Sequence, residues 1–504
     1  MIDRPRDTPE DAPDSAEHPT GTELNHNTFH GPAPISNGSG HQINYFNAVP
    51  PENRGPDSLA FLSAGVIQLK LAAASPHEAA DSLARLNPDK AAEVIRLMPE
   101  KRRIAIIPSM DEAPASAILR RLPEEVAAPL HLAMRAARAI STDAADWHDV
   151  LGDASGDLER RGRSQRGANG FVSHYDRGTI YWSETGGTGM VAGAIKKRYW
   201  KLGGNSGRLG YPIGRETHAA TSRFGTSGTF QRFESTWDYG PEALARTVTV
   251  CGATLYASVH GVFATWAGIG EYFEASGGTW GPLGFPLSEE MPVPGSSGDT
   301  TERYRQDFEG GTVYWSEQTG VAQVHPPIQE FLEQHALVGW LPLGDQEAVA
   351  QSQQGTAGVV QPFQYGPGDR NLLVYSSVER GTWSISGVIL IYFEAHGATA
   401  GPFGFPVEKI YFSAMEKSED IWKVQQFESG AIVSYGSGET LGVTGTIFAL
   451  WSANREVLGV PTAEQRTLGD GPDLLQCFKT GVVTVIDGIA RYWLSPGVQW
   501  EPEG

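Results

Sequence analysis

The chain has 504 residues, and its 59 acidic and 39 basic residues give a formal net charge of −20. The length allows two or three domains with separate cores, and the charge argues against wrapping nucleic acid or binding an anionic membrane, which both need a basic surface. Two cysteines, Cys251 and Cys477, are too few for a disulfide framework or a zinc site. We expect a multidomain protein without a metal or cofactor.

The first 57 residues differ in composition from the rest of the chain. Residues 1–57 are rich in Pro, Asp, Glu, Ser and Asn and poor in large apolar side chains, so burial cannot offset the entropy cost of ordering them. We predict a disordered acidic tail. It has no apolar signal-peptide core, and no part of the chain has an apolar run long enough to cross a bilayer. We therefore expect a cytoplasmic protein without a membrane span.

Within this tail, residues 35–47 are nearly uncharged, amide-rich and aromatic. Stacked copies of such a segment form cross-β ladders. The segment resembles the short amyloid signalling motifs at the N-termini of some bacterial adaptor proteins. The resemblance implies homotypic assembly, and a polar linker is the alternative. The residues expected to carry this assembly are Asn37, Gln42, Ile43, Asn44 and Tyr45.

Residues 66–140 contain no glycine, and their apolar residues recur at spacings of three and four. Prolines interrupt the pattern regularly, which predicts short helices that begin with Pro in the first turn. The phrases at 91–99 and 115–123 resemble the cytoplasmic N-terminal domain of MgtE-type magnesium transporters, which implies a small all-α superhelical domain. Because membrane segments are absent, we expect a platform for a protein partner. Residues 141–165 are interpreted as a linker that ends in a basic run.

Residues 166–504 contain a repeated motif. It reads LGYP at 209–212, LGFP at 283–286, FGFP at 403–406 and LGVP at 458–461, with a degraded copy at Gly344, and a Gln-x-Phe triplet follows each copy. Such a repeat predicts one structural unit, with Gly for a turn, Pro to fix φ and Phe for the core. The repeat-defining residues are Gly210, Pro212, Gly284, Pro286, Gly344, Gly404, Pro406, Gly459, Pro461, Phe233, Phe308, Phe363, Phe427 and Phe478.

The residues around each motif predict a short helix, the turn and a β-hairpin. An aromatic residue precedes four of the glycines by eleven positions, at Tyr199, Phe273, Phe393 and Phe448. After Phe308, Phe427 and Phe478, a Gly turn leads into a β-branched run that is typical of a hairpin, so we expect each unit to contribute one. A sixth hairpin-like segment, residues 171–182, has no motif before it. We expect this extra strand to complete the last unit and close a ring.

These features resemble the LGFP repeat family of actinobacterial proteins. The resemblance implies a cell-wall protein that binds a polysaccharide such as arabinogalactan, and a closed, propeller-like ring of five repeats. The expected fold is therefore α+β and multidomain, with a disordered tail, an all-α domain and this ring. The cell envelope is the family-based alternative to the cytoplasm.

Aromatic rings at the strand ends are the candidate ligand contacts, because a flat ring stacks on a sugar face. Packing between repeats is the alternative for each. Acidic residues follow every turn, at Glu216, Glu289, Glu290, Glu347, Glu408 and Glu464, whereas the carboxylate pair of a glycoside hydrolase is normally unique. We expect no catalytic residue and no enzyme. The candidate ligand-binding residues are Tyr181, Trp182, Trp237, Tyr314, Trp315 and Tyr435.

The leading hypothesis is a non-catalytic binding protein whose LGFP ring recognises a cell-wall polysaccharide or another envelope-derived ligand. An intracellular signalling or defence adaptor that assembles through residues 35–47 is the alternative. A glycoside hydrolase on a propeller-like ring is the third hypothesis.

Overall fold

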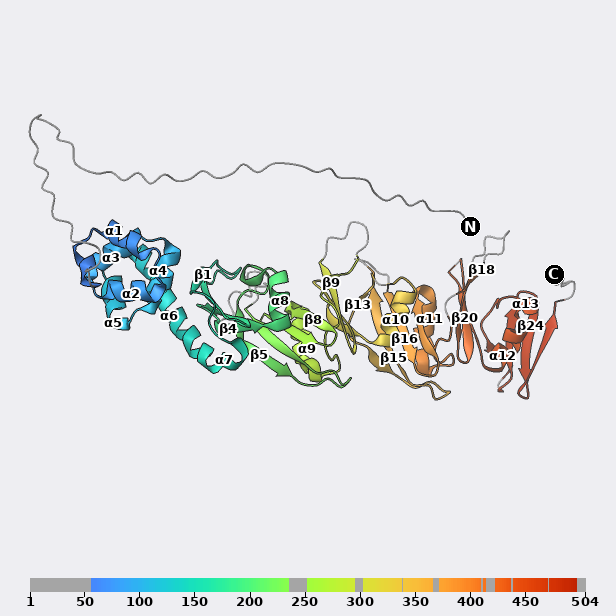
Figure 1. The fold of residues 1–504 in the computed structure, drawn as a ribbon. Helices are drawn as coiled ribbons and strands as arrows, with labels where there is room; N and C mark the ends of the chain where they lie inside the picture. Colours follow the sequence, from blue (N-terminus) through green and yellow to red (C-terminus); the bar gives the residue numbers. More distant parts are fainter. Residues whose placement is uncertain are drawn as a thin grey trace, which may run out of the picture. The chain divides into compact units, whose positions relative to one another are not determined.

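The fold is α+β, with a helical segment followed by a series of antiparallel sheets (Figure 1). A computed structural model describes residues 56–234, 252–294, 302–337, 339–365, 371–408, 411–413, 422–436, 438–469 and 471–495. The predicted assembly segment 35–47 and Trp237 lie outside the described residues.

Helices build the N-terminal part, and proline marks several of their starts: α2 and α3 begin at Pro76 and Pro88, and Pro99 and Pro123 precede α4 and α6. Ser75 and Glu78 form a reciprocal capping box at the start of α2, and the side chain of Asn87 caps α3. Their apolar faces meet in one core with α6. The helices are η2 Pro56–Phe61, α1 Ala64–Leu71, α2 Pro76–Ala84, α3 Pro88–Leu97, α4 Glu100–Ile106, η3 Ile107–Ser109, α5 Glu112–Leu119, α6 Glu124–Asp146 and α7 His148–Leu151.

Residues 141–165 are not a linker, which corrects the prediction. They hold the last turns of α6, all of α7, and strand β1, Glu159–Arg161, which pairs antiparallel with β2, Gly170–His174. The apolar face of α6 is buried against this first sheet, and Trp182 belongs to the same hydrophobic core as Ile140. Thr188 also donates a hydrogen bond to the Asp143 carboxylate. The helices and the first sheet therefore share one core.

The described strands form six sheet units, each with one or two leading strands followed by a three-stranded meander. The pairs are antiparallel, apart from one parallel bridge between Gly189 and Gly214 that joins units one and two. Unit one is β1, β2, β3 Gly178–Ser183 and β4 Gly187–Ala192; unit two is β5 Pro212–Ala219, β6 Gly228–Phe233, β7 Ala253–Ser258 and β8 Gly261–Trp266; unit three is β9 Met291–Pro292, β10 Arg303–Phe308, β11 Gly311–Ser316 and β12 Gly320–Val324. Unit four is β13 Leu341–Pro342, β14 Glu347–Val349, β15 Gly358–Gln364, β16 Asn371–Ser377 and β17 Gly381–Ser386; unit five is β18 Tyr411–Ser413, β19 Trp422–Phe427, β20 Gly430–Tyr435 and β21 Thr440–Thr444; unit six is β22 Arg466–Thr467, β23 Leu474–Phe478, β24 Gly481–Ile486 and β25 Ile489–Leu494.

A nine-residue helix connects each unit to the next. Its third residue is always Ile and its seventh is large and apolar, so both lie on one helix face. All ten of these side chains are at most 1% exposed, because each helix packs between the sheet before it and the sheet after it. The helices are α8 Gly193–Lys201, α9 Ala267–Ala275, α10 Pro326–Gln334, α11 Gly387–Ala395 and α12 Gly445–Ala453, and the paired residues are Ile195 with Tyr199, Ile269 with Phe273, Ile328 with Leu332, Ile389 with Phe393, and Ile447 with Trp451.

In three of the five Gln-x-Phe triplets the glutamine connects two sheet units, whereas Gln231 and Gln425 donate to carbonyls of their own unit. In unit three, the Gln306 amide donates to the carbonyls of Ser288, after the turn, and Ala264, in the preceding sheet, at 2.9 and 2.8 Å. Gln361 and Gln476 make the equivalent pair of bonds. These three glutamines are therefore clasps between neighbouring units.

Two predicted repeat positions need correction. Pro342 pairs with Phe363 as Pro286 pairs with Phe308, so the fifth copy of the turn lies at Leu341–Pro342. Gly344 does not have the positive φ of the other turn glycines. In the last copy, Trp451 stacks on Phe478, where Phe448 was expected. Both errors arise because the connection from helix to turn varies in length, so a fixed spacing points to the wrong residue.

No closed barrel or propeller is found within the described ranges, and closure into a ring stays a prediction. The N-terminal strands β1 to β4 pair within unit one, and β22 to β25 form a separate four-stranded sheet. The expected completion of the last unit by an N-terminal strand is therefore not observed among the described strands.

Candidate anion-binding site

Three of the predicted ligand contacts are buried. Tyr181, Trp182 and Tyr314 are at most 5% exposed. Tyr181 packs edge-on against Tyr199 in the core between units one and two, whereas Trp182 points into the core shared with α6. The Tyr314 hydroxyl donates to the side-chain oxygen of Gln329. These rings therefore offer no free face to a sugar, which corrects the prediction.

Trp315 and Tyr435, the other two predicted contacts among the described residues, are partly buried. Trp315 stacks on Tyr304 at 6.1 Å between ring centroids, and the Tyr435 hydroxyl donates to the carbonyl of Pro461. Trp200 and Trp280, which lie outside the strand ends, are exposed and were not among the predicted contacts.

The acidic residues after the turns mostly serve contacts between elements. Glu289 accepts from Arg198 on α8 at 3.1 Å, and Glu464 accepts from the Tyr392 hydroxyl on α11 at 2.8 Å. Glu216 accepts from the hydroxyl of Thr229 on the neighbouring strand.

The repeated turn has a structural explanation. Gly284 has φ +68°, and the carboxylate of Glu309 accepts from the backbone N–H of Phe285 at 2.8 Å. A Cβ on Gly284 would lie 2.3 Å from that carboxylate. Gly404 and Glu428 repeat this arrangement. The turn therefore requires glycine for its backbone angle and for the space it leaves.

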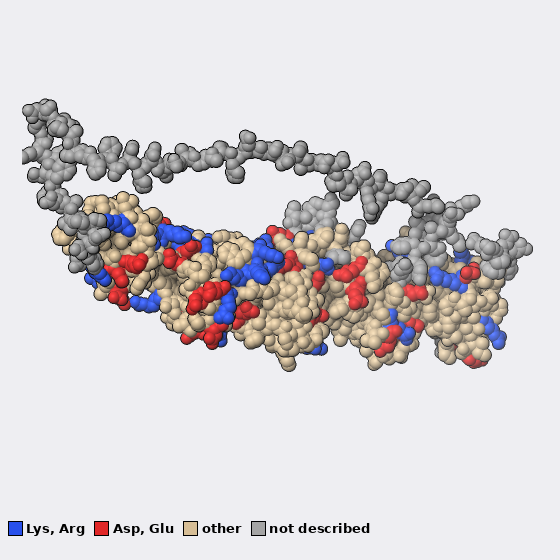
Figure 2. Space-filling model, in the orientation of Figure 1, with Lys and Arg blue, Asp and Glu red and all other residues tan. Residues whose placement is uncertain are grey.

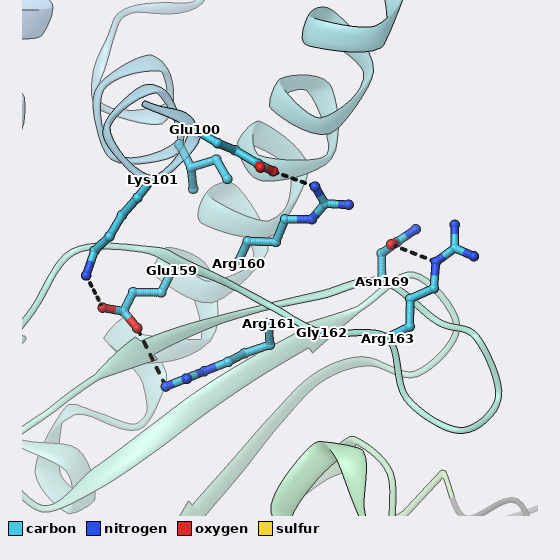
Figure 3. Close-up of a pocket in the computed structure, with 9 residues that line it drawn as sticks. Glu100, Lys101, Glu159, Arg160, Arg161, Gly162, Arg163 and Asn169 are labelled. Atoms are coloured by element: carbon cyan, nitrogen blue, oxygen red, sulfur yellow. Dashed lines mark hydrogen bonds and ion pairs between the residues drawn. The ribbon is translucent and has the colours of Figure 1, made fainter. Parts of the chain in front are cut away.

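A cavity of about 410 Å³ opens between α4 and β1, where the helices meet unit one. Figure 3 shows side chains from both elements converging on it. α4 contributes the first residues after Pro99, and β1 with the loop after it contributes three arginines. The residues that line it are Glu100, Lys101, Ile104, Glu159, Arg160, Arg161, Gly162, Arg163 and Asn169.

The lining has four cationic side chains and two carboxylates. Lys101 pairs with Glu159 at 3.0 Å, and Arg160 pairs with Glu100 at 2.5 Å. Arg161 lies 3.6 Å from Glu159, which already bonds Lys101. Figure 2 shows basic side chains gathered over α4 and β1. The cavity therefore has an excess of positive charge in a chain whose net charge is −20.

Arg161 and Arg163 have guanidinium N–H groups that could donate hydrogen bonds to a ligand. The Nε of Arg161 is buried and has no hydrogen-bond partner among the described residues, while its terminal nitrogen lies 3.2 Å from Nε2 of His174. Burial and the Arg161 charge lower the pKa of His174, so this ring is neutral at pH 7 and accepts from the guanidinium. Arg163 contacts only the side-chain oxygen of Asn169, at 3.4 Å, within the cavity lining.

The wall of the cavity is attached to the first repeated turn. The hydroxyl of Tyr211, from the LGYP motif, donates to the Gly162 carbonyl at 2.7 Å, and the Asn205 side chain donates to the same oxygen at 3.1 Å. The basic run at 160–166 can be recognised in the sequence. Its contact with α4 cannot, because Lys101 lies 58 positions before Glu159. Planar guanidinium groups favour carboxylate and phosphate ligands.

The described residues contain no cluster of His, Cys, Asp and Glu that could hold a metal ion. Among the same residues, no helix is long and apolar enough to span a membrane.

Comparisons with known families and structures fit this division of the chain. The sequence model of the LGFP repeat matches residues 162–207 and 283–336, and that of the MgtE intracellular N domain matches residues 39–123. The chain thus carries LGFP repeats after an MgtE-N-like helical segment. The cavity is built from both, because Lys101 lies in the MgtE match and Arg163 in the first LGFP match.

No curated protein matches the chain. A solved structure of a catalytically inactive virginiamycin B lyase from Staphylococcus aureus, with quinupristin, is 10% identical over 67% of this chain and 88% of the lyase, with a TM-score of 0.10. The extracellular domain of a protein assigned as a one-component system from B. thetaiotaomicron is 10% identical over 64% of this chain and 39% of that chain, with a TM-score of 0.11. These TM-scores carry no argument about function.

Proposed function

We propose that this protein is a non-catalytic binding protein that recognises an anionic group of an envelope-derived polysaccharide at the α4–β1 cavity. One observation carries the proposal: three arginines and a lysine line an open cavity with only two carboxylates, in an otherwise acidic chain. The overall electrostatic potential of an acidic protein does not attract an anion, so an anionic ligand needs cationic side chains at its site.

The position of the cavity supports a role for both parts of the chain. The LGFP segment supplies Arg163 and Asn169, and the helical segment supplies Lys101 and Glu100. A ligand held there touches the two at once. Its binding free energy therefore stabilises the arrangement in which α4 lies against β1, which gives the helices a way to report occupancy to a partner.

The test compares acidic with neutral polymers. Immobilised polygalacturonate, a glycerol-phosphate polymer and neutral arabinogalactan are offered to the full chain, and affinity is measured against salt concentration. We expect the acidic polymers to bind and their affinity to fall as salt rises. Equal affinity for all three polymers, or no binding to any, would refute the proposal.

Arg163→Gln is the informative variant, because Arg163 is in no ion pair within the cavity. We expect about a tenfold loss of affinity for the acidic polymers, the size of one charge-assisted hydrogen bond. Arg138→Gln is the matched control, since it removes the same charge from an exposed pair with Glu112 on the helical segment. If both variants weaken binding equally, net charge and not the cavity is responsible.

A further inference from the structure

The last strand of the array presents an apolar edge. Strand β25 pairs with β24 and is the terminal strand of its sheet. Its large side chains Ile489, Tyr492, Trp493 and Leu494 are exposed, and Ile486 at the end of β24 is exposed as well. A long apolar edge strand with free backbone groups is a template for pairing with another strand.

The other five units provide an internal control for this edge. Trp493 pairs with the second residue of its neighbouring strand, and the residues with the same register in earlier units include Val443 and Thr265. All five equivalents are at most 2% exposed, whereas Trp493 is 49% exposed. They are Val191, Thr265, Val324, Ile385 and Val443.

The difference follows from what covers this strand elsewhere. In earlier units, a nine-residue helix and the next sheet bury the position equivalent to Trp493. The carbonyl of the residue just before that position accepts from the next clasp glutamine, as at Gln323 and Gly442. Tyr492 carries the equivalent carbonyl in unit six. The sixth unit therefore exposes the surface that, in earlier units, packs against the next unit. The described residues contain no seventh unit to cover it.

The first unit does not offer the same opening. Its outer face is covered by α6, and Phe171 and Trp182 are buried in the core that they share with that helix. A second copy therefore cannot add its first unit onto β25 without uncovering its own core. The complementary surface that a second copy has available is β25 itself.

We propose that two copies of this chain associate by antiparallel pairing of β25 with β25. Residues opposite each other in an antiparallel pair lie on the same face of the sheet, so a two-fold axis must pass between a residue and its own copy. With Tyr492 on the axis, Tyr492 lies opposite Tyr492 of the other copy, Ala490 opposite Leu494, and Arg491 opposite Trp493. The last two pairs occur twice, as an isologous interface requires. Small Ala leaves room for Leu, and Arg beside Trp is a cation–π pair. Because pairing consumes the edge of both copies, assembly stops at two.

The mass of the full chain in solution tests the proposal, measured by light scattering and sedimentation velocity over a range of concentrations. We expect a concentration-dependent dimer that Trp493→Lys converts to monomer, because the change removes the cation–π pair and places Lys opposite Arg491 of the other copy. Trp280→Lys is the matched control, because Trp280 is exposed on a 3₁₀-helix far along the chain from β25. Circular dichroism and the melting temperature establish that both variants are folded.

Two outcomes overturn the proposal. One is a wild-type chain that stays monomeric at every concentration, and the other is a dimer that Trp280→Lys dissociates as well as Trp493→Lys. Deletion of residues 496–504 tests whether the C-terminal residues of the same chain cover β25. If they do, the full chain is monomeric and only the shortened chain dimerises. Hydrogen exchange adds a readout independent of mutation, since the amides of residues 489–494 gain protection with concentration if the strands pair.

Discussion

Gly404 shows why a four-residue motif is repeated through this chain. Its φ of +72° is in the left-handed region, and the Glu428 carboxylate lies where a Cβ would be. That carboxylate also accepts from Thr356 and from Arg380, at 2.7 Å to the arginine, so it connects three loops. Burial raises the pKa of Glu428, but these hydrogen bonds outweigh it and hold the pKa below its usual range.

Gly404→Ala is therefore expected to destabilise the protein by about 3 kcal/mol, from backbone strain and from the displaced carboxylate, which leaves the Phe405 N–H unpaired. Gly387→Ala is the matched control, because Gly387 has φ +62° but nothing within 4 Å of an added Cβ. It should cost about 1 kcal/mol. Urea unfolding followed by tryptophan fluorescence measures both. Equal losses would show that only the backbone angle matters.

Glu290 is expected to make stability depend on pH. Burial raises its pKa to about 7, above the 4.5 of an unperturbed carboxyl. Below pH 4.5 the group is protonated in both states. Between pH 4.5 and 7 the unfolded chain releases the proton and the folded chain keeps it, so stability falls by up to about 3 kcal/mol and is constant above pH 7.

Glu290→Gln should remove this decline and make the protein more stable than wild type at pH 8, with little difference at pH 4. Urea midpoints from pH 4 to pH 8 measure the effect. Glu271→Gln, an exposed change on α9, is the control that should retain the wild-type decline. A Glu290→Gln profile parallel to that of the wild type would contradict the assignment.

Among the elements, the connecting helix and the clasp glutamine carry the coupling between units. Isoleucine at helix position three and a large residue at position seven fill the space between two sheets, and Gln306 bonds carbonyls on both sides of it. The side-chain oxygens of the glutamines in all five triplets have no hydrogen-bond partner among the described residues. The clasp therefore depends on the amide N–H groups.

Gln306→Ala should lower stability by about 2 to 3 kcal/mol, because it leaves the buried carbonyl of Ala264 and the partly buried carbonyl of Ser288 without this donor. Gln334→Ala, an exposed change near the end of α10, should change stability by less than about 0.5 kcal/mol. Thermal unfolding compares the two. A loss no larger for Gln306 than for Gln334 would mean that helix packing alone joins the units.

Short sequence motifs predicted the helices, turns and hairpins. They did not predict which side chains are buried or which distant residues come into contact. Pro76 and Pro88 are the first residues of α2 and α3, as predicted, and the Gly and Phe of each motif indicate the turns and hairpins. Tyr181 and Trp182 were expected at a surface, but consecutive strand residues point to opposite faces, and this strand has a core on each side. The cavity arises from α4 and β1, so only the folded chain brings its cations together.

At the scale of the whole molecule, the helical segment acts as the cap of a repeat array. Repeat proteins need a terminal element that covers the open face of the first unit. Here α6 covers Phe171, Ile180, Trp182 and Met190 of unit one, in one core with the other helices. The basic cavity lies beside this cap, so the position of α4 determines both the covered core and the ligand site.

Removal of the cap should therefore damage the repeats themselves. A fragment of residues 162–504 uncovers four large apolar side chains, each worth about 2 kcal/mol of burial, and also lacks β1. We expect it to bind a hydrophobic dye, to aggregate and to melt at a lower temperature than residues 56–504. If α6 were only a tether, both fragments would melt alike, and protease would cut residues 141–165 first. Because those residues are packed helix and paired strand, we expect the longer fragment to resist cleavage there.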